Sequence, residues 1–126
     1  MTFFAESEFL CRCGRPECDA LKAPARALVV MLEIMRGLYG EPLVVTSGLR
    51  CPAWNAHEHG EPDSEHLTGE GADLACRRSG ERWAMLEAAR HAGFLRLGLG
   101  RDFLHVGMGP EPRAQRVLWT YYGSPR

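Results

Sequence analysis

The sequence predicts an α+β domain in which two principal helices pack against a mainly antiparallel sheet. Two observations indicate this fold class. Apolar residues recur at helical spacing in two segments, 25–39 and 79–93, and short strand-like runs lie between and after them. The chain has 126 residues, which is the usual size of one domain, so we expect residues 1–126 to form a single domain.

The amino-terminal part is predicted to be irregular over residues 1–22, because turn residues such as Gly14 interrupt its few apolar anchors. The first helix follows over residues 25–39. Pro24 stands at its start, where a missing N–H is tolerated. Gly40 supplies the stop signal at its end.

The middle of the chain is predicted to hold two strands with a short helix and a loop between them. The β-branched run 43–46 follows Pro42 and is typical of a buried strand. Pro52 occupies a position where a short helix can begin. Residues 60–63 are rich in turn formers and mark a loop, and residues 71–76 indicate the next strand.

The second principal helix is predicted to begin at Ser79, a natural cap, and to stop at Gly93. Three more strand candidates follow it, at residues 95–99, 103–106 and 117–121. Consecutive short strands of this kind favour antiparallel pairing in an α+β domain.

The bulk composition excludes several classes of protein. Hydrophobic residues make up 45% and charged residues 25% of the chain, which is typical of a globular domain. The formal net charge of -1 gives no sign of a nucleic-acid-binding protein, which would normally carry a basic face. No apolar run approaches the roughly 20 residues needed to cross a bilayer, so no membrane span is expected.

Three polar residues stand out against this background. His66, Asp73 and His105 supply two imidazoles and a carboxylate, which is the ligand set of a catalytic zinc site with one coordination position left open. They are too far apart in sequence to share a helical turn, so a loop and a strand must bring them together. This separation distinguishes the pattern from the compact His-Glu-x-x-His helix of other metalloproteases.

These residues belong to a series of motifs that runs through the chain. The motifs are Thr46-Ser47-Gly48-Leu49-Arg50-Cys51-Pro52, Asn55, Ser64-x-His66, Gly69-x-x-x-Asp73 and Asp102-x-x-His105. In this order they resemble the zinc D-alanyl-D-alanine carboxypeptidase and L-alanyl-D-glutamate endopeptidase family, from about Phe9 to about Tyr121. The resemblance implies the fold shared with the amino-terminal Hedgehog signalling domain. It also implies hydrolysis of bacterial peptidoglycan stem peptides.

The resemblance assigns a role to each residue of the expected site. His66, Asp73 and His105 would hold zinc, and metal-activated water would attack the peptide bond. Asp102 stands three residues before the last histidine, where related enzymes carry a carboxylate that acts as general base and acid. Arg50 fits the family position of a cation that stabilises the charge developing on the carbonyl oxygen.

The alternative to a catalytic role for Asp102 is a structural one. In this interpretation Asp102 is a solvated turn residue paired with Arg101 or Arg96, as surface charges commonly are. In that case Glu70 is the reserve candidate for the base, and Glu65 is a weaker one.

Two further positions near the ligands bear on the function. Ser64 either hydrogen-bonds the substrate, orients the ligand loop, or is a turn-forming serine beside Asp63. Where many family members continue His-x-Asp after the last ligand, this chain has Gly107. Loss of such a partner can cost about 10–100-fold in metal affinity or activity. The alternative function is therefore a catalytically decayed, zinc-containing cell-wall or protein binding module.

The five cysteines leave three interpretations open. Cys11, Cys13 and Cys18 fall close together, and Cys51 and Cys76 lie further along the chain. The first three could form a disulfide cluster, a second structural zinc site with Cys51, or reduced thiols buried as small hydrophobes. Without a signal peptide, reduced thiols or one fortuitous bridge are favoured. A structural cysteine-zinc protein without an active site is a third hypothesis for the whole chain.

The start of the sequence has no basic segment followed by an apolar core, so a secretory signal is not expected. We therefore expect synthesis in the cytoplasm and action on the cell wall. A phage or prophage lysis protein would reconcile the two. The expected partner is a peptidoglycan peptide, the expected cofactor is zinc, and we expect a monomer.

Overall fold

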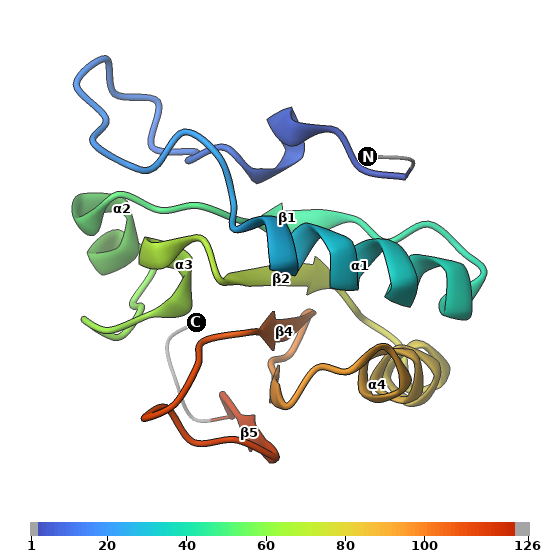
Figure 1. Ribbon diagram of the computed structural model, residues 1–126. Coiled ribbons are helices and arrows are strands. Elements are labelled where there is room, and N and C mark those ends of the chain that lie inside the picture. Colours follow the sequence, from blue (N-terminus) through green and yellow to red (C-terminus); the bar gives the residue numbers. More distant parts are fainter. Residues whose placement is uncertain (1–2, 123–126) are drawn as a thin grey trace.

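The computed structural model describes residues 3–122 of the chain (Figure 1). Its strands form a five-stranded sheet in the order β1-β2-β4-β3-β5, and neighbouring strands are antiparallel except for the parallel pair β3 and β5. The elements in chain order are η1 (Glu6–Phe9), α1 (Arg26–Tyr39), β1 (Val45–Ser47), α2 (Pro52–His57), α3 (Glu65–Thr68), β2 (Gly71–Ala75), α4 (Ser79–Ala92), β3 (Arg96–Leu99), β4 (Phe103–Gly107) and β5 (Val117–Thr120). The predicted fold class is confirmed. Residues 1–2, the start of the segment predicted to be irregular, lie outside the described part.

Both principal helices form where the sequence predicts them, but the N-cap of α4 is Arg78, and Ser79, the predicted cap, is the first helical residue. The buried residues of α1 include Leu28, Leu32 and Met35, which recur at intervals of four and three and so share one face. α1 ends at Gly40 and α4 ends at Gly93, and both glycines adopt the left-handed conformation that favours glycine. Figure 1 shows α1 and α4 on the right of the view and the short helices α2 and α3 on the left.

The neighbouring strands β2 and β4 have one apolar face and one polar face. Leu74 of β2 and Leu104 of β4 belong to the apolar core that α1 and α4 complete. Successive side chains of a strand point to opposite faces, so the adjacent residues Asp73 and His105 lie on the other face of the sheet. Asp73 and His105 are directly paired across β2 and β4. The register of two strands therefore places two of the expected ligands side by side.

The amino-terminal segment docks onto the stretch that follows β1. The Leu49 backbone N–H donates to the Phe9 carbonyl at 2.7 Å. A Cβ on Gly48 would lie 2.8 Å from the Phe9 Cα, so only glycine allows this approach. Phe9 is itself fully buried. This docking fixes the backbone that leads into Arg50.

β1 is irregular where it approaches the polar face. Val45 pairs with Leu74, but Ser47 pairs with Asp73, and the register shifts between the two pairs. The shift places Ser47 opposite Asp73, and Arg50 donates to the side chains of both. Within residues 3–122, none of the helices has the length and apolar character needed to cross a membrane.

Candidate metal centre and active site

The structure brings His66, Asp73 and His105 together on the polar face of the sheet. His66 Nε2 lies 3.2 Å and His105 Nδ1 lies 2.9 Å from the same oxygen of Asp73, Oδ1. Suitable ligand atoms of the three residues all lie within 4.8 Å of one another. Each residue is at most 3% exposed. Three donors that are distant in the sequence therefore converge at one buried point.

His66 sits on α3, a one-turn helix in a stretch where the sequence predicts a loop. The Ser64 hydroxyl caps this helix by accepting from the His66 backbone N–H at 3.2 Å, and Gly69 ends it in the left-handed conformation. The ring Nδ1 lies 2.7 Å from the Gly48 carbonyl, which can only accept, so Nδ1 carries the proton. The Nε2 lone pair then faces Asp73. Burial lowers the pKa of His66, which favours this neutral, ligand-competent ring.

His105 is oriented in the same way by Glu65. The His105 Nε2 lies 3.0 Å from Glu65 Oε1, and Glu65 Oε2 accepts from Arg96 Nε at 2.9 Å and from the Gly109 backbone N–H at 2.7 Å. A carboxylate at Nε2 fixes the ring tautomer and leaves Nδ1 to face Asp73, as carboxylate partners do for histidine ligands in metal sites. Burial alone would raise the pKa of Glu65, but the hydrogen bonds from His105 and Arg96 lower it to about 2.

The Glu65 carboxylate occupies the space beside position 107. A Cβ on Gly107 would overlap both carboxylate oxygens of Glu65, so no larger residue fits there unless Glu65 moves. The carboxylate that the sequence lacks at position 107 is thus matched by one that reaches His105 from α3. Sequence spacing did not reveal this role for Glu65, because Glu65 and Gly107 come together only through the packing of α3 against the sheet.

Arg50 holds the far oxygen of Asp73. Its NH2 group donates to Asp73 Oδ2 at 3.2 Å, its Nε to Ser47 Oγ at 3.0 Å and its NH1 to Asn55 Oδ1 at 3.2 Å. Asp73 is therefore a carboxylate with one oxygen fixed by Arg50 and the other directed at both imidazoles. The predicted role of Arg50 toward a substrate oxygen stays a prediction.

Asp102 is not brought beside these residues. It lies in the exposed two-residue turn between β3 and β4, which is closed by the Gly100 N–H donating to the Phe103 carbonyl at 2.9 Å. In the register of β4 the turn lies beyond the Phe103–Ala75 pair, about 10 Å along the strand from His105 at roughly 3.4 Å per residue. Its role as base stays a prediction. The reserve candidate Glu70 instead accepts from the Thr68 hydroxyl at 2.6 Å.

A cleft of about 540 Å³ opens next to His105 and Glu65. Aromatic residues of the carboxy-terminal strand region line it, as do charged residues of both signs. These lining residues are Trp119, Tyr121, Tyr122, Glu61, Asp63, Arg96 and Arg113. The Trp119 ring lies 5.7 Å from the His105 ring, measured between centroids. A larger hollow of about 710 Å³ lies between α4 and β5, but none of the three converging residues lines it.

A family model described as peptidase M15 matches residues 2–107. The chain belongs to the peptidase M15 family. A search of curated proteins finds no match to the chain. The matched range ends at Gly107 and thus includes His66, Asp73 and His105.

Membership of the peptidase M15 family supports a metallopeptidase, and members of this family are in general zinc-dependent. The site residues fit a divalent cation. With His66 Nδ1 and His105 Nε2 directed at acceptors outside the centre, the other nitrogen of each ring and one carboxylate oxygen point to one position, an arrangement that suits a cation held between them. Neutral imidazole and carboxylate are preferred zinc ligands, and three protein ligands are the usual set of a catalytic site.

Proposed function

We propose that this protein is a zinc metallopeptidase that hydrolyses peptide bonds of bacterial peptidoglycan stem peptides, of the D-Ala-D-Ala carboxypeptidase or L-Ala-D-Glu endopeptidase type. The observation that carries the proposal is the convergence of His66 Nε2, Asp73 Oδ1 and His105 Nδ1 in a member of the peptidase M15 family. A bound zinc ion supplies Lewis acidity, which polarises a carbonyl group and makes water nucleophilic at neutral pH.

The surrounding residues hold this ligand set in place. The Gly48 carbonyl and the Glu65 carboxylate each accept a hydrogen bond from the histidine nitrogen that does not face the centre, which favours the tautomer whose other nitrogen faces the metal position. Arg50 prevents Asp73 from rotating, because it binds the oxygen that the histidines leave. Ser64 fixes the turn that carries His66, which favours the ligand-orienting alternative for this serine.

The cleft offers an extended peptide both apolar walls and charged side chains. Trp119 and Tyr121 offer flat apolar walls, while Arg96 and Arg113 offer positive charge. Arg96 already binds Glu65, so Arg113 is the better candidate for a substrate carboxylate. Arg113 lies 4.0 Å from the exposed Asp63, a weak contact that a substrate carboxylate could replace.

The general base of the proposed mechanism is a carboxylate near the cleft. Asp102 remains the candidate that the family pattern indicates, and its use requires the turn between β3 and β4 to bring the carboxylate toward the cleft when substrate binds. The exposed position of Asp102 is also the observation that favours the second candidate function, a zinc-containing binding module without turnover. The Glu65 contact with His105 speaks against decay of the metal site itself.

The proposal is tested by digesting purified peptidoglycan and identifying the new ends by mass spectrometry. Wild type is expected to release new amines, with loss of a single D-alanine indicating a carboxypeptidase and separation of L-Ala from D-Glu indicating an endopeptidase. Asp73→Asn should abolish release, while Glu87→Gln, an exposed substitution on α4, should not. Zinc-loaded wild type that binds the wall without releasing amines would establish the binding module instead. Release of wall fragments by added protein would also support the hypothesis of a phage or prophage lysis protein.

A further inference from the structure

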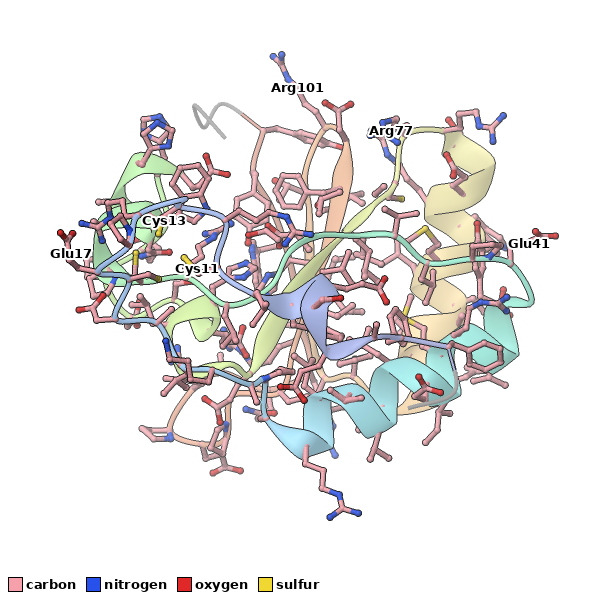
Figure 2. The ribbon with its side chains drawn as sticks, turned by 90° about the horizontal axis from the view of Figure 1, so that it is seen from above. Cys11, Cys13, Glu17, Glu41, Arg77 and Arg101 are labelled. Atoms are coloured by element: carbon pink, nitrogen blue, oxygen red, sulfur yellow. The ribbon has the colours of Figure 1, made fainter. Side chains whose placement is uncertain are left out.

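A second group of metal-binding side chains lies apart from the His66 site. The Sγ atoms of Cys11, Cys13, Cys18 and Cys51 all lie within 4.8 Å of one another, and all four cysteines are free thiols. Three belong to the amino-terminal segment, and Cys51 is the residue that caps α2. Figure 2 shows Cys11 and Cys13 close to each other on that segment, beside α2.

The spacing of the four sulfurs is close to that of a metal–thiolate cluster. A tetrahedral zinc ion with bonds of about 2.3 Å to sulfur holds its four sulfurs about 3.8 Å apart. The four Sγ atoms, at no more than 4.8 Å, would have to move by only about 1 Å to reach that geometry. Four thiols brought to one point from two separate segments are not explained by apolar packing, because the three amino-terminal ones are only half-buried.

Hydrogen-bond donors are already directed at these sulfurs. Backbone N–H groups donate to sulfur from Cys51 to Cys11 at 3.3 Å, from Arg15 to Cys13 at 3.4 Å and from Trp54 to Cys51 at 3.4 Å. The Arg15 guanidinium also donates to Cys51 Sγ at 3.3 Å. A neutral thiol is a weak acceptor, whereas a thiolate is a strong one. This set of donors and the arginine therefore suit negatively charged sulfur.

Between η1 and α1 the amino-terminal segment is held to the rest of the fold mainly by hydrogen bonds, such as Arg12 NH2 to the Val45 carbonyl at 3.0 Å and the Ala25 N–H to the Gly69 carbonyl at 2.8 Å. None of residues 10–27 is fully buried, and Leu10 and Leu21 are exposed. An irregular segment of this length loses conformational entropy on ordering and gains little from apolar burial here. A metal ion held by four thiolates adds a stronger attachment to these hydrogen bonds, as it does in small zinc-stabilised folds.

We propose that Cys11, Cys13, Cys18 and Cys51 bind a second zinc ion, which has a structural role. Binding converts four thiols to thiolates, releases four protons to solvent and involves no oxidation. The resulting cluster carries two negative charges, which the Arg15 guanidinium partly offsets. Because Cys51 follows Arg50 directly, the cluster fastens the amino-terminal segment to the residue that holds Asp73.

The test measures metal and thiols in wild-type protein purified under reducing conditions. We expect two zinc ions per chain, one lost in His105→Ala and the other lost in Cys13→Ala or Cys18→Ala. The control is Cys76→Ala, which removes a fully buried cysteine of the apolar core and should keep both ions. A His105→Ala protein that keeps one ion supports the cysteine site whether or not the protein is a peptidase.

Cobalt substitution provides a readout that needs no variant. A four-thiolate site gives intense sulfur-to-cobalt charge-transfer absorption, and a site of two imidazoles and a carboxylate gives none. We expect this absorption in wild type and in His105→Ala, and its loss in any cluster variant that remains folded. The proposal is overturned if reduced wild type shows no such absorption. The proposal is also overturned if the four cysteines form two disulfides in protein that was purified without any added oxidant.

Discussion

Replacing Glu65 with glutamine tests the account of how His105 is held. Glutamine keeps the size of the side chain but offers one oxygen and one amide NH2 in place of two oxygens. In the structure one Glu65 oxygen faces His105 Nε2, and the other faces the N–H groups of Arg96 and Gly109. His105 Nε2, Arg96 Nε and the Gly109 N–H are all donors. Whichever way the glutamine amide is turned, its NH2 group would therefore face a donor rather than an acceptor.

The size of the effect follows from that mismatch. Loss of the partner that orients a histidine ligand costs about 10–100-fold in metal affinity. This factor corresponds to about 1.4–2.7 kcal/mol at 1.36 kcal/mol per tenfold change. A buried donor left without an acceptor is expected to lower the free energy of unfolding by a further ~1–3 kcal/mol.

The assay is a competition titration with a zinc chelator on wild type, Glu65→Gln and the exposed control Glu87→Gln. The relevant zinc ion is identified as the one that His105→Ala loses. Glu65→Gln should bind that ion about 10–100-fold more weakly than the other two proteins. An affinity within a factor of two of wild type would refute the idea that Glu65 orients His105.

Three further predictions concern the same site. Gly107→Asp alone should weaken zinc binding and lower stability, because the new Cβ would overlap the Glu65 carboxylate. Glu65→Ala combined with Gly107→Asp should recover part of the lost zinc affinity. Equal zinc affinities for the single and double variants would argue against a shared space. The Asp102→Ala protein should keep its zinc and its melting temperature, since Asp102 is an exposed turn residue. If Asp102 is the base, turnover by this variant should fall about 10²–10⁴-fold. Unchanged turnover would remove Asp102 from that role. The pKa of Glu65 is lowered from 4.5 to about 2, so its contribution to the stability of the metal-free protein is present above pH 4.5 and is lost as the pH falls toward 2. Acid unfolding monitored by circular dichroism should therefore be less steep over that range in Glu65→Gln, and superimposable curves would contradict the assignment.

The fold was largely predictable because its signals are local. Helix ends depend on glycines such as Gly40 and Gly93, and both adopt the left-handed conformation that ends a helix. The alternation of Asp73 between apolar neighbours likewise indicates a strand with one polar face. The parallel pairing of β5 with β3 was not predicted, because periodicity describes a strand and not its partner.

The site was predictable only in part, because sequence patterns do not show which distant segments contact one another. The ligand pattern of His66, Asp73 and His105 was evident from residue types and from the family resemblance, and the structure places these residues together. The role of Glu65 depends on a contact between segments that are far apart in sequence, so spacing carried no sign of it. A missing side chain at Gly107 was the one clue, because the space it leaves must be filled by another residue.

The most direct test of the central claim is a crystal structure of the wild-type protein with zinc, using anomalous diffraction at the zinc absorption edge. The account predicts an anomalous peak about 2.0–2.2 Å from His66 Nε2, Asp73 Oδ1 and His105 Nδ1. Zinc-containing crystals with no anomalous density between these three atoms would contradict it.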